Sequence, residues 1–132
     1  MDPPPETLTI GTAPALPPPT AARVLDGEVG APGRCRGPAR LVHGLADFER
    51  VLPGDVLVAA YTDPGWTPVL ERAAGLVLEA GGLLSHGAIV ARELGIPALV
   101  GVLDVMRVIR DGDTVEVNVT AGSVTIVARG SS

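Results

Sequence analysis

Gly81 to Ala98 reads GGLLSHGAIVARELGIPA, the most informative run of the sequence. It follows one short apolar segment and ends at the start of another. Gly81 and Gly82 allow the sharp turn that follows a strand, and Ser85 is a good N-cap because its hydroxyl can accept a first-turn amide. The run therefore predicts a strand, a glycine turn, a helix over His86 to Leu94 and a second strand.

Short β-branched runs alternate with helical segments on both sides of this run. The predicted strands are Ala39 to His43, Asp55 to Ala60, Gly75 to Glu79, Ala98 to Val102, Thr114 to Val119 and Ser123 to Val127, and the predicted helices are Leu45 to Val51, Thr67 to Ala73, His86 to Leu94 and Asp104 to Val108. Uninterrupted apolar strands are typical of parallel pairing, whereas turns at Gly112-Asp113 and Ala121-Gly122 predict hairpins. The fold class is therefore α/β with a mixed sheet.

Composition excludes several kinds of protein. The chain has 132 residues, 15 of them acidic and 10 basic, and only 2% are aromatic. An acidic chain with so few aromatic rings is a poor nucleic-acid partner. No apolar run approaches the roughly 20 residues that span a bilayer, so we expect no membrane insertion. One cysteine, Cys35, excludes an internal disulfide and fits a cytoplasmic protein; we expect it to be an unreactive thiol.

Proline divides the chain into two unequal parts. Seven of the 13 prolines lie before residue 20, in a segment without sustained periodicity. We expect residues 1–20 to form a flexible tail or linker, residues 21–129 to form one domain and residues 130–132 to be disordered. A proline-rich ligand for a partner is the alternative interpretation of the tail.

His86 stands where the central predicted helix begins. Unpaired N–H groups and the positive end of the helix dipole meet there, which suits a phosphate or another anion. A neutral imidazole is also a competent nucleophile toward phosphorus. His86 is therefore the candidate catalytic residue, and the candidate phosphate cradle consists of Gly81, Gly82, Ser85, Gly87 and Arg92.

Other interpretations of these residues stay open. His86 could be a polar helix-start residue without chemistry, and Arg92 could lie in solvent or in a salt bridge. Ser85 could be a hydrolase nucleophile, but adjacent Ser and His side chains diverge on a helix, and no Gly-x-Ser-x-Gly elbow surrounds it. We expect His43, the second histidine, to be structural. Two histidines without clustered carboxylates predict no metal site.

The run from Gly81 to Ala98 resembles the signature of the mobile, or swivelling, phosphohistidine domain of phosphoenolpyruvate-utilising enzymes. Gly54 to Val58, Thr62 to Pro68 and the Asp111-Gly112-Asp113 turn are similar to further family segments, so the resemblance covers about residues 24 to 128. It implies a compact three-layer β/β/α domain in which His86 carries a phosphoryl group. The signature looks most like the version found in rifampicin phosphotransferases and phosphoenolpyruvate synthase-like proteins.

The resemblance also implies partner domains. Family members pass the phosphoryl group between an ATP-grasp nucleotide site, which uses ATP and Mg²⁺, and a second site that uses pyruvate, phosphoenolpyruvate or another acceptor. Such domains do not fit into 132 residues, so we expect the chain to be catalytically incomplete alone, to hold no cofactor itself and to work with these domains in cis or in trans.

Two positions depart from the family pattern. Leu84 stands where dikinases usually have a phosphorylatable threonine, which excludes that kind of regulation here and disfavours a dikinase. Val117 to Gly122 replaces the usual closing Val-Asp-Gly turn. The sequence thus favours a phosphohistidine carrier, and the alternative is a non-catalytic docking module that keeps the fold with an idle His86.

Overall fold

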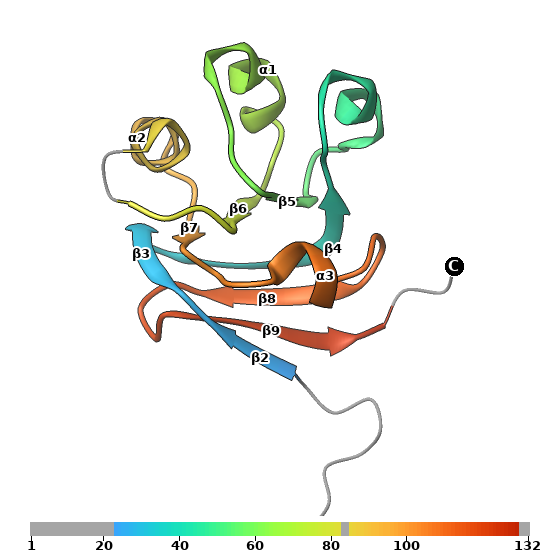
Figure 1. Cartoon of the computed structure of the whole chain (residues 1–132), viewed down its shortest axis with the longest axis vertical. Helices are drawn as coiled ribbons and strands as arrows, with labels where there is room; N and C mark the ends of the chain where they lie inside the picture. Colours follow the sequence, from blue (N-terminus) through green and yellow to red (C-terminus); the bar gives the residue numbers. More distant parts are fainter. Residues whose placement is uncertain (1–22, 83–84, 130–132) are drawn as a thin grey trace, which may run out of the picture.

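A computed structural model of the chain describes residues 23–82 and 85–129 (Figure 1). The expected tail at residues 1–20, the expected disordered end at residues 130–132 and Leu84 lie outside the described residues. The elements, in chain order, are β2 (Arg23–Asp26), β3 (Glu28–Ala31), β4 (Arg34–Leu41), the 3-10 helix η1 (Leu45–Arg50), β5 (Val56–Ala59), the 3-10 helix η2 (Pro64–Trp66), α1 (Thr67–Leu70), β6 (Gly75–Leu78), α2 (His86–Leu94), β7 (Ala98–Val100), α3 (Val105–Val108), β8 (Thr114–Asn118) and β9 (Ser123–Ala128).

The sheet is mixed, as the sequence predicts. Its strand order is β2-β9-β8-β4-β5-β6-β7-β3. The four strands β4 to β7 pair in parallel, while β2, β9, β8 and the first half of β4 pair antiparallel, and β3 runs antiparallel to β7. Every residue of β5, β6 and β7 is buried, which explains why these strands are continuously apolar.

Two shared strands fold this sheet into two layers. Arg34 to Pro38 of β4 pairs with β8, whereas Ala39 to Leu41 pairs with β5. At the other corner, only Gly27 separates β2 from β3, although they lie at opposite ends of the strand order. A Cβ on Gly27 would lie 2.6 Å from a methyl carbon of Val102, so the bend requires glycine. Both outer strands are thus joined, which leaves no long open sheet edge in the described residues.

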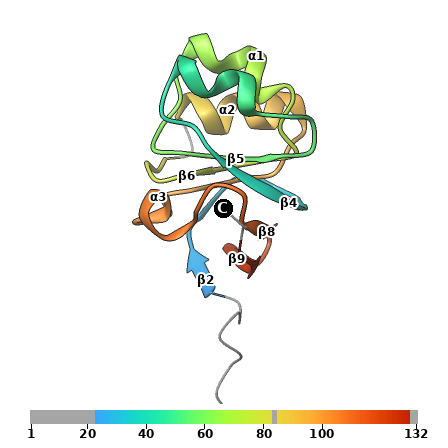
Figure 2. The ribbon, with the colours of Figure 1, turned by 90° about the vertical axis from the view of Figure 1, so that its right-hand side faces the viewer.

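Apolar side chains form two cores, one on each side of the parallel strands. One core lies between the two β layers and includes Val58, Val77 and Ile126. The other lies between the parallel strands and the helices and includes Leu57, Leu78 and Ala91. Figure 2 shows α1 and α2 above, the parallel strands in the middle and β8, β9 and α3 below. The compact three-layer β/β/α architecture is confirmed.

Helix α2 has the predicted bounds because both of its ends are specified locally. Ser85 has extended backbone angles, and its side chain accepts a hydrogen bond from the N–H of Ala88. Gly95 ends the helix in the left-handed conformation, with φ 75°. Ala88 and Ala91 are fully buried, so small side chains let the helix lie close to the sheet.

Some sequence predictions differ from the structure. The turn at Gly112-Asp113 connects α3 to β8, so the hairpin predicted there is wrong, while the hairpin through Ala121-Gly122 is confirmed. The helix predicted over Leu45 to Val51 is a 3-10 helix, and that over Thr67 to Ala73 stops at Leu70. Strands β2 and β3 were not predicted. Their exposed residues lack the alternation that reveals a half-buried strand.

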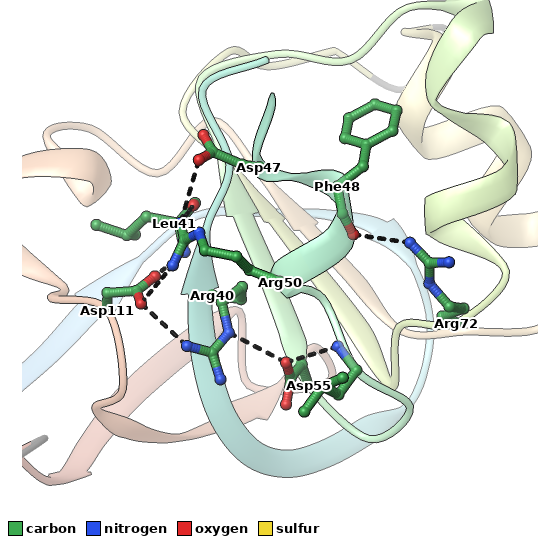
Figure 3. A network of polar contacts seen from close by, with 9 residues as sticks. Arg40, Leu41, Asp47, Phe48, Arg50, Asp55, Arg72 and Asp111 are labelled. Atoms are coloured by element: carbon green, nitrogen blue, oxygen red, sulfur yellow. Dashed lines mark hydrogen bonds and ion pairs between the residues drawn. The ribbon is translucent and has the colours of Figure 1, made fainter. Parts of the chain in front are cut away.

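Charged side chains are tied together around β4, in a cluster that we call the β4 charge network. Its members are Arg40, Asp47, Arg50, Asp55 and Asp111 (Figure 3). Arg40 bridges Asp55 (3.1 Å) and Asp111 (3.0 Å), and Arg50 reaches Asp111 at 2.8 Å. The network fastens η1, β4, β5 and the turn before β8 to one another.

Within residues 23–82 and 85–129, no helix is both long and apolar enough to cross a membrane.

Candidate functional site

The loops around His86 all lie at one end of the sheet, where the parallel strands finish. Because β4, β5, β6 and β7 are parallel, the segments that follow them emerge on the same side, and β3 begins there because it is antiparallel to β7. We call this the histidine edge, and its described segments are 42–45, 60–63, 79–82, 101–104 and the start of β3 at Glu28. Ligands of open parallel sheets characteristically bind at such carboxyl ends.

His86, the first residue of α2, is half-buried and makes one side-chain hydrogen bond that fixes its ring. Its Nδ1 lies 3.0 Å from Oγ1 of Thr62, which follows β5. When Nδ1 carries the proton, the Thr62 oxygen accepts it and Nε2 keeps its lone pair. In this tautomer Nδ1 is engaged by the Thr62 oxygen, and Nε2 is the ring nitrogen that carries the lone pair.

Thr62 is the site residue that sequence reasoning missed. It was noted only as part of the family-like segment Thr62 to Pro68, without a role. The contact joins residues 24 positions apart, on two different strand ends. Its signal in the sequence is its place directly after the apolar run of β5, which puts it at the same edge as the glycine turn.

Gly87 lets α2 approach the site closely. A Cβ on Gly87 would lie 2.6 Å from Cδ1 of Leu78 and 3.0 Å from Oγ1 of Thr62. Even the smallest side chain would therefore displace either the core or the hydroxyl that contacts His86. Gly87 is buried, and its lack of a side chain lets the start of α2 lie close to Leu78 and Thr62.

The glycine turn before α2 is a place of close backbone approach. A Cβ on Gly81 would lie 3.2 Å from the Cα of Gly101, so the loops after β6 and β7 touch there. Gly82 has φ 121°, a conformation that side chains with a Cβ rarely adopt. Its carbonyl accepts a hydrogen bond from the N–H of Ser85 at 3.2 Å. The structure thus brings Gly81, Gly82, Ser85, His86 and Gly87 together in one turn.

Arg92 points to a different part of the domain. Its Nε donates to the carbonyl of Gly30 on β3 at 2.9 Å. Six residues along a helix amount to about 9 Å of rise and a third of a turn away from the His86 face. In this structure Arg92 ties α2 to β3, and its role in the phosphate cradle stays a prediction.

The sequence predicts no chemistry for His43 or Cys35, and the two residues differ in exposure: His43 is exposed, whereas Cys35 is partly buried. The side chain of His43 is exposed at the histidine edge, and its backbone N–H donates to Asp47 at 2.8 Å. Cys35 lies on β4, and burial raises the pKa of its thiol to about 11. A thiol with so high a pKa is almost fully protonated at neutral pH, in keeping with the expected lack of reactivity.

The sequence comparisons agree with this geometry. Residues 51–122 match the family of the PEP-utilising enzyme mobile domain, and the match includes Thr62 and His86. The chain belongs to this family. As a mobile domain, it has the fold that the sequence resemblance implied.

Relatives of known name place the mobile domain within much longer proteins. The chain is 44% identical to chondramide synthase cmdD of Chondromyces crocatus over 117 residues, which are 89% of this chain and 3% of that protein. It is 44% identical to the rifampicin phosphotransferase of Bacillus cereus over 95 residues, 72% of this chain and 11% of that enzyme. A solution structure of Enzyme I superposes with a TM-score of 0.52 and 32% identity, covering 59% of this chain and 32% of that one.

The mobile domain is a small part of each of these relatives. The chain spans 3% to 12% of the length of the curated relatives that it matches. Mobile domains of this kind occur in phosphotransferases, where other domains make up most of the protein.

Proposed function

We propose that this mobile domain is a phosphohistidine carrier, in which His86 accepts a phosphoryl group from one partner domain and delivers it to another. The observation that carries the proposal is the 3.0 Å contact between His86 Nδ1 and Thr62 Oγ1 at the start of α2. With the proton on Nδ1 and the Thr62 oxygen accepting it, Nε2 keeps its lone pair and is the nucleophilic nitrogen of this proposal.

The transfer chemistry balances with groups at the histidine edge. The lone pair of Nε2 attacks phosphorus, the new N–P bond forms, and the electron pair of the broken P–O bond leaves with the donor oxygen. The ring then carries a positive charge, which the Thr62 oxygen stabilises by accepting a hydrogen bond from Nδ1–H. In the second half-reaction, an acceptor oxygen attacks the same phosphorus and the electron pair of the N–P bond returns to Nε2.

The start of α2 supplies favourable surroundings for the transferred group. The helix has nine residues, and the positive end of its dipole lies beside His86. Gly81, Gly82, Ser85 and Gly87 shape the turn around that position. ATP and Mg²⁺, or phosphoenolpyruvate, would bind to the partner domains and not to this chain.

Chemical phosphorylation tests the nucleophile without a partner domain. The full chain is incubated with phosphoramidate, which transfers its phosphoryl group to histidine as ammonia leaves, and the product is mapped by mass spectrometry. We expect an acid-labile phosphate on His86 in preference to His43, although His43 is the more exposed ring. His86→Ala should lose this label, and the matched variant His43→Ala should keep it. Equal labelling of both rings, or preference for His43, would overturn the proposal.

Enzymatic labelling tests the carrier role itself. As the phosphoryl donor we would use ATP, Mg²⁺ and the ATP-grasp domain that the family resemblance implies for the Bacillus cereus rifampicin phosphotransferase, a relative 44% identical to this chain over 95 residues. The relative's own mobile domain serves as the positive control. Intact mass should show one added phosphoryl group on the wild-type chain and none on His86→Ala. A chain that phosphoramidate labels but that no nucleotide domain labels would fit the docking-module alternative.

A further inference from the structure

The most exposed apolar side chains of the described residues gather at the histidine edge. Leu103, Leu45 and Tyr61 expose 78%, 72% and 64% of their surface, and every other large apolar side chain in the described ranges exposes less. Each of the three follows a different parallel strand, β7, β4 and β5 respectively. Exposed apolar side chains grouped around one site mark an interaction surface.

A small pocket opens beside one of these residues, Tyr61. Its lining residues are Val42, His43, Ala60, Tyr61, Trp66 and Met106, and its volume is about 60 Å³. Val42 and Trp66 belong to the core under the helices, whereas Met106 packs against the core between the β layers. The pocket therefore lies at the strand ends, where the two cores meet the surface. Its size fits one apolar side chain and excludes a nucleotide or a sugar.

The pocket and His86 are held by the same short segment. Tyr61 lines the pocket, and the next residue, Thr62, contacts the His86 ring. The tilted rings of Tyr61 and Trp66, with centroids 6.5 Å apart, fix the segment from the pocket side. A group seated in the pocket would therefore lie against the segment that positions the nucleophile.

Charge at the histidine edge has one sign. Its described segments contain four carboxylates, at Glu28, Asp63, Glu79 and Asp104, and they contain no lysine or arginine. Arg107 on α3, three residues after Asp104 in the chain, forms an ion pair with Asp104 at 3.4 Å. A surface of this kind attracts a basic partner and repels an acidic one.

We propose that the histidine edge docks on a basic face of a partner domain, which places one large apolar side chain in the pocket lined by Tyr61, Trp66 and Met106. This rests on the proposed carrier function and names the chemistry of the surface that His86 meets. The apolar side chain anchors the complex, while Leu45 and Leu103, which follow β4 and β7, exclude water from the interface. Basic residues on the partner pair with the four carboxylates and also with the phosphoryl group.

Docking by these groups also serves the chemistry. Phosphoryl transfer between domains competes with hydrolysis, so the interface must exclude water before the N–P bond forms or breaks. Exposed apolar side chains at the ends of β4, β5 and β7, which lie on both sides of β6, do this in the docked state, whereas an acidic surface alone would stay hydrated. The carboxylates then supply long-range attraction, which speeds encounter and weakens with salt.

The test compares two routes to the same phosphohistidine in the full chain. Phosphoramidate reaches His86 without docking, whereas the Bacillus cereus ATP-grasp domain with ATP and Mg²⁺ must dock. The docking variants are Leu103→Ser, Leu45→Ser, the pocket-filling Ala60→Leu and the charge-removing pair Asp63→Asn with Asp104→Asn. The matched controls are Leu52→Ser, which is 57% exposed at the opposite end of β5, and Glu116→Gln on β8.

Each result has a defined meaning. We expect the docking variants to slow labelling by the ATP-grasp domain about tenfold, the size of a typical interface anchor, and to leave phosphoramidate labelling within twofold. Wild-type labelling by the domain should also slow with added salt. Docking variants that are labelled as fast as Leu52→Ser would overturn the docking surface, as would a wild-type chain labelled by phosphoramidate alone. Loss of both routes in the wild-type chain would contradict the carrier function itself.

Discussion

The histidine edge and the β4 charge network differ in how their charged side chains are arranged. In the network, acids and bases are interleaved, and Arg40 and Arg50 each bridge two carboxylates. At the histidine edge, the described segments carry four carboxylates beside three highly exposed apolar side chains. The network also uses buried charge, since the side chain of Asp55 is 5% exposed.

This difference separates the part that holds the domain together from the part that meets other molecules. Charges that are paired within the domain and shielded from water add to its stability, and losing one partner leaves the other uncompensated. Exposed leucines and acids of one sign add little to folding and are useful only when something binds. We therefore expect changes in the two regions to affect different measurements.

Asp55→Ala should have the largest effect on stability. The Asp55 carboxylate accepts hydrogen bonds from Arg40 Nε at 3.1 Å and from the N–H of Leu52 at 2.9 Å, and alanine leaves both donors without it. We expect the free energy of unfolding to fall by about 3 kcal/mol, measured by urea denaturation. Phosphoramidate labelling of His86 in the folded protein should stay unchanged.

Asp55→Asn is the matched control for this variant. Asparagine keeps an oxygen that can accept the hydrogen bond from the N–H of Leu52 and removes only the negative charge. The loss of stability should therefore be smaller than for Asp55→Ala. If Asp55→Ala were as stable as the wild type, or if it lost His86 labelling while folded, the separation between the two regions would not hold.

Thr62→Val should show the converse behaviour. Valine has nearly the shape of threonine and removes the oxygen that contacts Nδ1 of His86, so the ring loses its orientation while the packing near Gly87 remains. We expect phosphoramidate labelling of His86 to slow about tenfold, which corresponds to one hydrogen bond. Thr62→Ser keeps the hydroxyl and should be labelled nearly as fast as the wild type. Thermal unfolding of both variants should lie close to that of the wild type, and equal labelling rates for valine and serine would contradict the role of the hydroxyl.

Much of the fold was predictable because its signals are local. The N-cap Ser85 and the left-handed Gly95 set the bounds of α2, and uninterrupted apolar residues mark β5 and β6. Strand β2 has no such signal. Its four residues pair with β9, about one hundred positions away, and three of them are exposed. Its place in the sheet is decided by the closure at Gly27, which only the assembled chain reveals.

The candidate site was predictable to the same extent. His86 and its glycine turn form one continuous motif, so sequence alone indicates them. Thr62 comes from another strand end, and Tyr61 and Met106 meet at the pocket from segments 45 positions apart. The place of Arg92 in the phosphate cradle stays a prediction, and the structure adds that its Nε donates to the carbonyl of Gly30 on β3. Residues brought together by the sheet can be named only once the strand order is known.

Acid should weaken the β4 charge network by a small and separable amount. Burial opposes ionisation of Asp111, but the backbone N–H of Leu41 and the guanidinium groups of Arg50 and Arg40 outweigh it and lower the pKa of Asp111 below its ordinary value. A hydrogen bond from the N–H of His43 likewise lowers the pKa of Asp47, with Arg50 adding to the effect. Carboxylates with lowered pKa values stabilise the fold above their ordinary pKa, and this contribution is lost as the pH falls through their folded values.

The comparison with Asp111→Asn isolates this contribution. Because Asp111 is partly exposed, we expect the variant to lose less than about 1 kcal/mol at pH 7. The difference in unfolding free energy between wild type and variant should stay constant from pH 7 down to about 5 and shrink below about 4, where the wild-type carboxylate takes up its proton. Urea denaturation across this pH range measures it. The matched variant Asp63→Asn removes a carboxylate at the histidine edge, outside the network, where Asp63 accepts a local hydrogen bond from the N–H of Gly65. A difference that grows as the pH falls would mean that Asp111 opposes the fold instead of fastening it.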